Sequence, residues 1–194
     1  MQYESPHGSD RPDISVVPHQ GKKPVIPDSV YLAPGVRIIG EVTLGERCSI
    51  WYNVVIRGDV HFIRIGEETN IQDGSVLHVT HDTHPLVIGN RVTAGHAVRL
   101  HGCTIEDETL IGIGAIVLDG ARVEKQSLVA AGALVPPGMV VPSGTLVAGV
   151  PARVRRNLSR TEREDLVASA ARYVAYAQAA RKGSAPGGSV TADG

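Results

Sequence analysis

The sequence has few of the residues that mark several common classes of protein. It contains two cysteines, Cys48 and Cys103, among 194 residues, far fewer than a small disulfide-stabilised domain would carry. We therefore expect both thiols to be reduced and neither to be catalytic. It also lacks a basic run and has a formal net charge of −1. Binding to nucleic acid needs phosphate-neutralising charge, so we expect no nucleic-acid partner.

Long hydrophobic runs and aromatic residues are scarce as well. No stretch approaches the ~18 apolar residues of a membrane span, and the first residues lack the apolar segment of a signal peptide. We expect a cytoplasmic protein with no membrane partner. Aromatic residues make up 4% of the chain, whereas 22 glycines and 12 prolines accompany many valines and isoleucines. This balance is typical of repeat proteins.

An aliphatic or small apolar residue recurs every six positions through most of the chain. The leading positions are Leu32, Ile38, Leu44, Ile50, Ile56, then Ile65, Ile71, Leu77, then Ile88, Ala94, Leu100, and then Ile105, Ile111, Val117, Val123, Val129, Val135, Val141 and Val147. Six residues make one short strand and one turn, and such a strand buries its inner face only when successive units coil and stack. A β-sandwich would instead need a period of two and hairpin turns.

The predicted fold is therefore an all-β solenoid, a parallel β-helix of hexapeptide repeats followed by a C-terminal α-helix. Similarity to hexapeptide-repeat proteins implies three faces per coil and left-handed winding. We expect residues 24–157 to form the β-helix, and residues 158–183, with a capping box at Ser159 and Glu162, to form a helix packed on it. Residues 1–23 are predicted to be a loose arm and residues 184–194 a flexible tail.

Histidines gather where the six-residue spacing is interrupted. The step from Ile56 to Ile65 is nine residues, from Leu77 to Ile88 eleven, and from Leu100 to Ile105 five. In a triangular coil, Leu77 and Leu100 are vertical neighbours, so the residues that follow them, His78 and His101, should stack about 4.8 Å apart. Two imidazoles so placed can share a metal ion, and Arg57 belongs to the same column.

A second column lies on another face. His96 follows Ala94 by two positions, and Asp73 stands at the equivalent place one coil earlier. Because two faces of one prism point apart, we expect these columns to meet across a threefold interface, with the third ligand supplied by a neighbouring subunit. Zinc held by three histidines, with a fourth position left for water, is the catalytic form of a zinc site. The sequence thus predicts a homotrimer with metal sites between its subunits.

Charged residues near these histidines suggest an interface ion pair. Arg57-Gly58-Asp59 lies inside the repeat region, so an adhesion role is rejected. Asp59 or Asp73 of one subunit facing Arg57 of another would form a charge-assisted pair.

Several of these segments together resemble the γ-class carbonic anhydrases. They are Trp51-Tyr52-Asn53-Val54-Val55-Ile56-Arg57-Gly58-Asp59, Thr69-Asn70-Ile71-Gln72-Asp73, Leu77-His78, Gly95-His96 and Leu100-His101-Gly102. The resemblance covers about residues 30–156. It implies a trimer that binds zinc, or alternatively iron or cobalt, through His78 and His101 of one subunit and His96 of the next. Metal-bound hydroxide would then hydrate carbon dioxide reversibly to bicarbonate.

The resemblance also assigns roles to other residues. Arg57, Asp59 and Asp73 would tie subunits together, while Asn70 and Gln72 would position water or substrate. Tyr173, in the predicted helix, occupies a place similar to an active-site tyrosine of the family.

One departure from the family pattern concerns proton transfer. Acidic shuttle residues expected after Asp59 and three positions after His78 are replaced by Val60 and His81. His81 or His84 could carry the proton instead, since an imidazole titrates near neutral pH; the alternative is that both are ordinary loop residues.

Two other functions remain open for a chain of this kind. Hexapeptide trimers also host acyl-CoA-dependent transferases and thioesterases, because a fold does not by itself define a reaction. The missing shuttle acids also leave open a metal-binding scaffold without activity.

Overall fold

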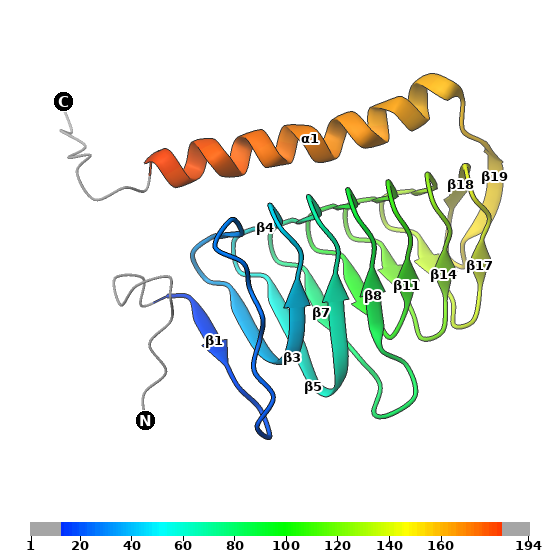
Figure 1. Ribbon diagram of the computed structural model, residues 1–194. Coiled ribbons are helices and arrows are strands. Elements are labelled where there is room, and N and C mark those ends of the chain that lie inside the picture. Colours follow the sequence, from blue (N-terminus) through cyan, green and yellow to red (C-terminus); the bar gives the residue numbers. More distant parts are fainter. Residues whose placement is uncertain (1–12, 184–194) are drawn as a thin grey trace, which may run out of the picture.

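The computed structural model describes residues 13–183, which form a triangular parallel β-helix with one long helix along its side (Figure 1). Strands of successive coils pair in parallel, and one coil returns to the same face after three strands. The predicted fold class is confirmed: the chain is a left-handed β-helix of hexapeptide repeats followed by an α-helix. None of the described helices is long and apolar enough to cross a membrane.

We name the three sides of the prism face 1, face 2 and face 3, in chain order. The strands of face 1 are β2 (Tyr31–Leu32), β4 (Ser49–Ile50), β6 (Asn70–Ile71), β9 (Thr93–Ala94), β12 (Leu110–Ile111), β15 (Leu128–Val129) and β18 (Thr145–Ala148), to which the antiparallel β19 (Arg153–Asn157) is added. Face 2 contains β7 (Val76–His78), β10 (Arg99–His101), β13 (Ile116–Val117) and β16 (Leu134–Val135). Face 3 contains β8 (Leu86–Ile88), β11 (Thr104–Ile105), β14 (Arg122–Val123) and β17 (Val140–Val141).

Two longer strands turn the corner between faces 2 and 3. β3 (Arg37–Leu44) and β5 (Val55–Ile65) pair with each other along both faces, with a register shift between Gly40 and Val42. β1 (Ser15–Val17) adds to the edge of β3. This pairing differs from the loose arm expected for residues 1–23, because the main chain of β1 completes the exposed edge of β3. Residues 1–12 of that arm, and the expected flexible tail at 184–194, lie outside the described residues.

The core is the stack of inward residues that the six-residue period picked out. Vertical neighbours such as Ile56, Leu77 and Leu100 are buried, as the register predicts. Cys48 and Cys103 are also buried, and burial raises the pKa of the Cys48 thiol to about 12. Both thiols are therefore held in the protonated, unreactive form.

Helix α1 (Arg160–Gly183) runs back along face 1, from the last coil toward the first (Figure 1). Its buried positions Leu166, Ala170 and Ala177 are four and seven residues apart, the spacing of one face of a helix. The predicted capping box is also present: the Glu162 backbone N–H donates to Ser159 Oγ, and the Ser159 backbone N–H donates to Glu162 Oε2.

Candidate metal centre

His78 and His101 lie one above the other at the ends of β7 and β10. Their Cα atoms are register partners, and His78 Nδ1 lies 3.1 Å from His101 Nε2. Two nitrogens bound to one tetrahedral zinc ion at 2.0–2.1 Å would be about 3.3 Å apart. The facing nitrogens therefore already have nearly the separation that a shared metal ion requires.

The far nitrogen of each ring meets a carboxylate. His78 Nε2 lies 3.0 Å from Asp59 Oδ1, and His101 Nδ1 lies 2.6 Å from Asp119 Oδ1. A carboxylate on the outer nitrogen fixes the tautomer of a metal-binding histidine and leaves the inner nitrogen available as the ligand. The donor set thus fits a metal ion.

Arg57 completes this corner by pairing with Asp59 in the same chain, at 2.5 Å. Partial burial acts to raise the pKa of Asp59, but hydrogen bonds from Arg57 and His78 outweigh it and lower the pKa to about 2. The sequence led us to expect Arg57 to face a carboxylate of another subunit. Within one chain its guanidinium already pairs with the Asp59 carboxylate, whose other oxygen contacts His78.

His96 lies at the opposite edge of face 2, in the turn that follows β9. His96 Nδ1 is 2.6 Å from Asp73 Oδ2, and the backbone N–H of Tyr52 donates to Asp73 Oδ1. Within the described part of the chain, the other ring nitrogen of His96 has no hydrogen-bond partner. The side chain is 46% exposed, so this nitrogen can be reached from outside the subunit.

Residues 13–183 contain no group of three histidine, cysteine, aspartate or glutamate side chains arranged to hold a metal within one chain. The width of face 2 separates His96 from His78 and His101. The sequence placed these residues on two different columns, and the structure does the same.

A buried polar chain under helix α1 orients Gln72. Asn70 Nδ2 donates to the Val92 carbonyl and to Thr93 Oγ1, which directs Asn70 Oδ1 toward Gln72 Nε2, 3.0 Å away. Thr93 Oγ1 in turn donates to Ser169 Oγ of the helix. One N–H of the Gln72 amide is thus engaged, and its second N–H and its carbonyl oxygen remain to interact with a ligand.

Tyr173 lies on the face of α1 that covers the aromatic side chains of face 1. Its ring meets Trp51 edge-on, with the centroids 5.7 Å apart. Burial raises the pKa of Tyr173, and the negative charge of Asp73 adds to the effect. The Tyr173 hydroxyl is therefore protonated at neutral pH and lies within electrostatic reach of the carboxylate that holds His96.

The two loop histidines have different surroundings. His81 pairs with Asp82, and its side chain is 74% exposed. His84 packs over Gly102 and Gly120. Val60, which stands where the family pattern has an acid, packs against the core instead. Of the two, His84 is the one in contact with the turn that carries His101.

Three polar residues at this site were not predicted from the sequence: Asp119, Thr80 and Ser169. Asp119 follows Val117 by two positions, so column counting could have placed it one coil beyond Gly102. Thr80 and Ser169 lie in a loop and a helix, where the six-residue register does not apply.

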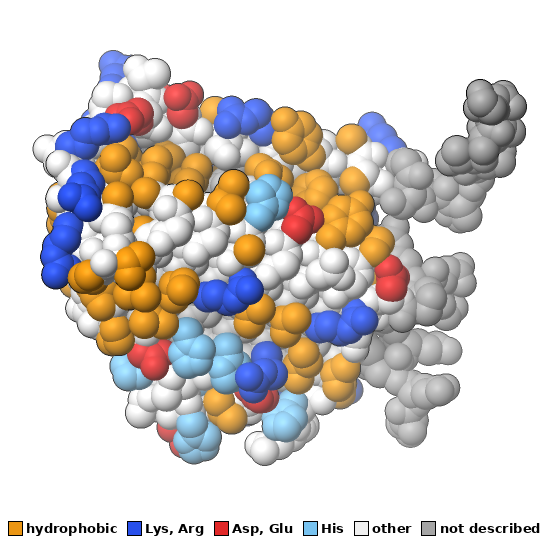
Figure 2. Space-filling model, turned by 180° about the vertical axis from the view of Figure 1, so that it is seen from behind, with side chains coloured by type: hydrophobic (Ala, Val, Ile, Leu, Met, Phe, Trp, Pro, Cys, Tyr) orange, Lys and Arg blue, Asp and Glu red, His pale blue; other side chains and the backbone are white. Residues whose placement is uncertain are grey.

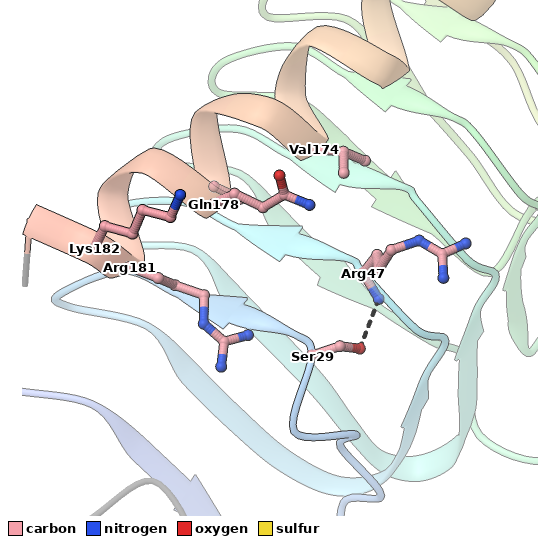
Figure 3. Close-up of a pocket in the computed structure, with 7 residues that line it drawn as sticks. Ser29, Arg47, Val174, Gln178, Arg181 and Lys182 are labelled. Carbon is pink, nitrogen blue, oxygen red and sulfur yellow. Dashed lines mark hydrogen bonds between the residues drawn. The ribbon is translucent and has the colours of Figure 1, made fainter.

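A separate hollow of about 440 Å³ lies between the last turns of α1 and the first coils (Figure 3). Arg181 and Lys182 line it from the helix, and Arg47 and Ser29 line it from the β-helix. The two cations of the last helical turn offset the negative end of the helix dipole. This hollow contains none of the histidines described above.

The fold and these repeats define a class of protein. Residues 23–58 match the family "Bacterial transferase hexapeptide (six repeats)". A structure from Bacillus cereus described as an acetyltransferase superposes with a TM-score of 0.86 at 40% identity, covering 88% of this chain and 98% of that one. A hexapeptide transferase family protein from Anaplasma phagocytophilum superposes with a TM-score of 0.81 at 42% identity, covering 84% of this chain and 96% of that one. The chain is a hexapeptide-repeat β-helix protein.

Sequence relatives narrow the class to one family. A protein of Methanocaldococcus jannaschii named as a probable carbonic anhydrase is 52% identical over 77% of this chain and 94% of its own length. The carbonic anhydrase of Geobacillus kaustophilus is 46% identical over 84% of this chain and 89% of its own length. The mitochondrial γ carbonic anhydrase 1 of Arabidopsis thaliana is 47% identical over 81% of this chain, which spans 59% of that relative. The chain belongs to the γ-class carbonic anhydrase family.

Proposed function

We propose that this protein catalyses the reversible hydration of carbon dioxide to bicarbonate at a metal ion held between the subunits of a homotrimer. His78 and His101 of one subunit and His96 of the partner subunit would hold the ion. The observation that carries the proposal is the pairing of each of these histidines with an aspartate on its outer nitrogen, which leaves the inner nitrogen for the metal.

Exposed apolar side chains near His96 support a shared site. Ile113 lies one coil above His96 and is 57% exposed in the single chain. Figure 2 shows histidine side chains on this side of the molecule next to hydrophobic ones. Val76 and Ile116 project outward from face 2, between the two histidine columns. Arg99 lies between Val76 and Ile116 in this column, and its guanidinium donates to backbone carbonyls. A partly apolar surface beside histidine side chains is suited to a subunit interface.

Zinc is the metal we propose, with iron or cobalt as the alternatives that three imidazoles also accept. The chemistry that zinc supplies when bound is a lowered pKa of water, from 15.7 to about 7, which makes a nucleophile available at neutral pH. Gln72 would accept a hydrogen bond through its carbonyl oxygen and so orient water or substrate, and Asn70 holds the Gln72 amide in that orientation. Tyr173 would line the site as a neutral hydrogen-bond donor.

Arg57, Asp59 and Asp73 act on the histidines in this proposal. Asp59 and Asp73 keep the outer nitrogens of His78 and His96 occupied, and Arg57 keeps Asp59 ionised. Hydration of carbon dioxide releases one proton for each bicarbonate formed, so a group must carry it to solvent. His84, with His81 as the second candidate, is proposed for that step.

Subunit mixing tests the proposed site most directly. A His96→Ala trimer and a His101→Ala trimer should each lose metal and carbon dioxide hydration, measured by elemental analysis and stopped-flow. When the two variants are unfolded and reassembled together, roughly a quarter of the interfaces should again contain three histidines by random assembly. Metal and hydration should return in that proportion. A His19→Ala variant treated in the same way is the control and should behave as the unmodified protein.

The outcome separates the candidate functions. If all three ligands came from one subunit, mixing would restore nothing, and the shared site would be wrong. Metal that returns without hydration would favour a scaffold. The likeness to structures described as transferases makes acyl transfer from coenzyme A the second candidate. Acyl transfer that persists after the metal is removed would favour that activity.

A further inference from the structure

Asp119 reaches back across one coil to His101. It lies in the turn after β13, directly above Gly102, and the Gly120 N–H donates to the Gly102 carbonyl at 2.8 Å. A Cβ on Gly102 would stand 2.3 Å from Asp119 Oδ1. Glycine at this position, with a φ of +52°, therefore leaves the space through which the carboxylate reaches the imidazole.

The two oxygens of Asp119 have different partners. Oδ1 lies 2.6 Å from His101 Nδ1, and Oδ2 accepts a hydrogen bond from Thr80 Oγ1 at 2.9 Å. With both oxygens engaged, rotation of the carboxylate would break at least one hydrogen bond. The position of the carboxylate is therefore set from two sides.

Thr80 comes from the eleven-residue step that interrupts the repeat, and it is itself held in place. Its backbone N–H donates to the His84 carbonyl at 3.1 Å, and the His84 N–H donates back to the Thr80 carbonyl at 3.4 Å. This short antiparallel bridge closes the loop, which packs over Gly102. The inserted loop thus delivers one hydroxyl group to the carboxylate that contacts His101.

We propose that Asp119 is a positioning residue for the metal ligand His101 and that the loop of residues 79–85 supports it through Thr80. The inference rests on the proposed function, since it concerns how one of the proposed ligands is prepared. The carboxylate would accept a hydrogen bond from the Nδ1–H of His101, which leaves the lone pair of His101 Nε2 free to bind a metal ion shared with His78. Without Asp119, the neutral ring can adopt either tautomer and can rotate.

Cobalt binding measures this effect without relying on catalysis. Metal-free protein is titrated with Co²⁺, and the visible absorption of the bound ion gives the Kd. Asp119→Ala should raise the Kd 10- to 100-fold, the range for lost carboxylate partners of metal-binding histidines. Asp119→Asn, which keeps an acceptor oxygen without the charge, should have a smaller effect, and Thr80→Val should fall between Asp119→Asn and the unmodified protein.

A carboxylate that bridges coils at a different corner provides the matched control. Asp107 Oδ1 accepts a hydrogen bond from the Asn90 N–H, away from the histidines, so Asp107→Ala should lose stability without changing the Kd. An equal rise in Kd for Asp107→Ala and Asp119→Ala would overturn the proposal, because the loss would then reflect general destabilisation. An unchanged Kd in Asp119→Ala would also overturn it.

Nitrogen-15 NMR of the imidazole rings provides a second readout, in the metal-free protein. His101 should be protonated on Nδ1 when neutral, and Asp119→Ala should shift it toward a mixture of tautomers. This result separates the two proposals. If the unmodified protein binds no Co²⁺, the proposed function fails, yet the tautomer still tests Asp119. If metal binds but the tautomer is the same in both proteins, the role of Asp119 is wrong while the metal site stands.

Discussion

At the scale of single residues, the site is built from three histidine–aspartate pairs. The pairs are His78–Asp59, His96–Asp73 and His101–Asp119. Each occupies one imidazole nitrogen and leaves the other for a metal ion. The chemistry of the site therefore depends as much on the aspartates as on the histidines, although the histidine spacing is the stronger signal in the sequence.

Proton transfer is also decided by single residues. We predict that His84→Ala lowers carbon dioxide hydration in weak buffer by about 10²-fold, the range for a lost acid–base group, and that His81→Ala has a smaller effect. His84 packs over the turn that carries His101, whereas His81 is mostly in solvent. Stopped-flow assays across a series of buffer concentrations measure the hydration rates of both variants.

Added imidazole should restore the rate of His84→Ala, because it replaces the missing proton acceptor. The hypothesis that either histidine carries the proton is wrong if both variants keep the full rate in weak buffer.

Glycine at the coil corners provides a stability prediction. A Cβ on Gly112 would lie 2.4 Å from the Ala131 nitrogen and 2.8 Å from the Val129 carbonyl oxygen. We predict that Gly112→Ala lowers the free energy of unfolding by about 1–3 kcal/mol, because the next coil must move. Gly114 has open space around its Cα but a φ of +67°, so Gly114→Ala should cost only about 1 kcal/mol.

Urea unfolding of the two variants and of the unmodified protein gives the free energy of unfolding of each, and so compares the two losses of stability. If Gly112→Ala is no more destabilising than Gly114→Ala, close approach of the coils is not what requires glycine at position 112.

At the scale of elements, the interruptions of the repeat explain where the site lies. All three irregular steps fall in the passage from face 2 to face 3, between β5, β7 and β10 on one side and β8 and β11 on the other. The extra residues leave the coil there without disturbing the strands above and below. Asp59, His78 and His101 are consequently brought to one corner.

Helix α1 yields a pH prediction through its capping box. Hydrogen bonds from Arg156 and from the Ser159 N–H lower the pKa of Glu162 to about 2, below its ordinary value of 4.5. A carboxyl whose pKa is lowered by folding stabilises the folded state above its ordinary pKa. That contribution is lost as the pH falls from about 4.5 to 2.

We therefore predict that Glu162→Gln lowers the Tm at pH 7 and that its difference from the unmodified protein shrinks toward pH 2. Thermal unfolding followed by circular dichroism at several pH values measures this Tm difference. A Tm difference that stays constant down to pH 2 would contradict an ionised cap. Glu164→Gln, which removes an exposed i,i+4 pair with Arg160, is the matched control and should change the Tm little.

At the scale of the whole molecule, the single chain presents the half-exposed His96 and the exposed Ile113 at one edge. We predict that Ile113→Asp converts the proposed trimer to monomers and prevents metal binding, because a charge would be buried beside His96 at the proposed interface. Light scattering after size-exclusion chromatography measures the mass, and elemental analysis measures the metal.

Val140→Asp is the control for this prediction. Val140 is 52% exposed on β17 of face 3, away from both histidine columns, so its substitution should leave the trimer and the metal intact. Trimers that persist in Ile113→Asp would show that this edge is not the interface.

The sequence by itself determined the β-helix, from its six-residue period, and the C-terminal α-helix, from its capping box. The three-strand coil, which stacks His78 on His101, came from the resemblance to hexapeptide-repeat proteins. Within the β-helix, a register of six residues carries a position in sequence directly into a position in space. The family was also recognisable from short segments inside that register. The register could be continued across the interruptions, so the placement of Asp73 one coil before His96 was predictable too.

Only the tertiary structure decided which groups the histidines contact. Asp59 turns to His78 within its own chain, Thr80 reaches Asp119 from a loop, and Ser169 reaches Thr93 from the helix. None of these contacts follows from the repeat. Asp59 lies in β5, within the nine-residue step that interrupts the period, and the loop and the helix approach the prism from outside its register. The conformations of those segments are set by packing and hydrogen bonds between residues distant in sequence, which no local period encodes.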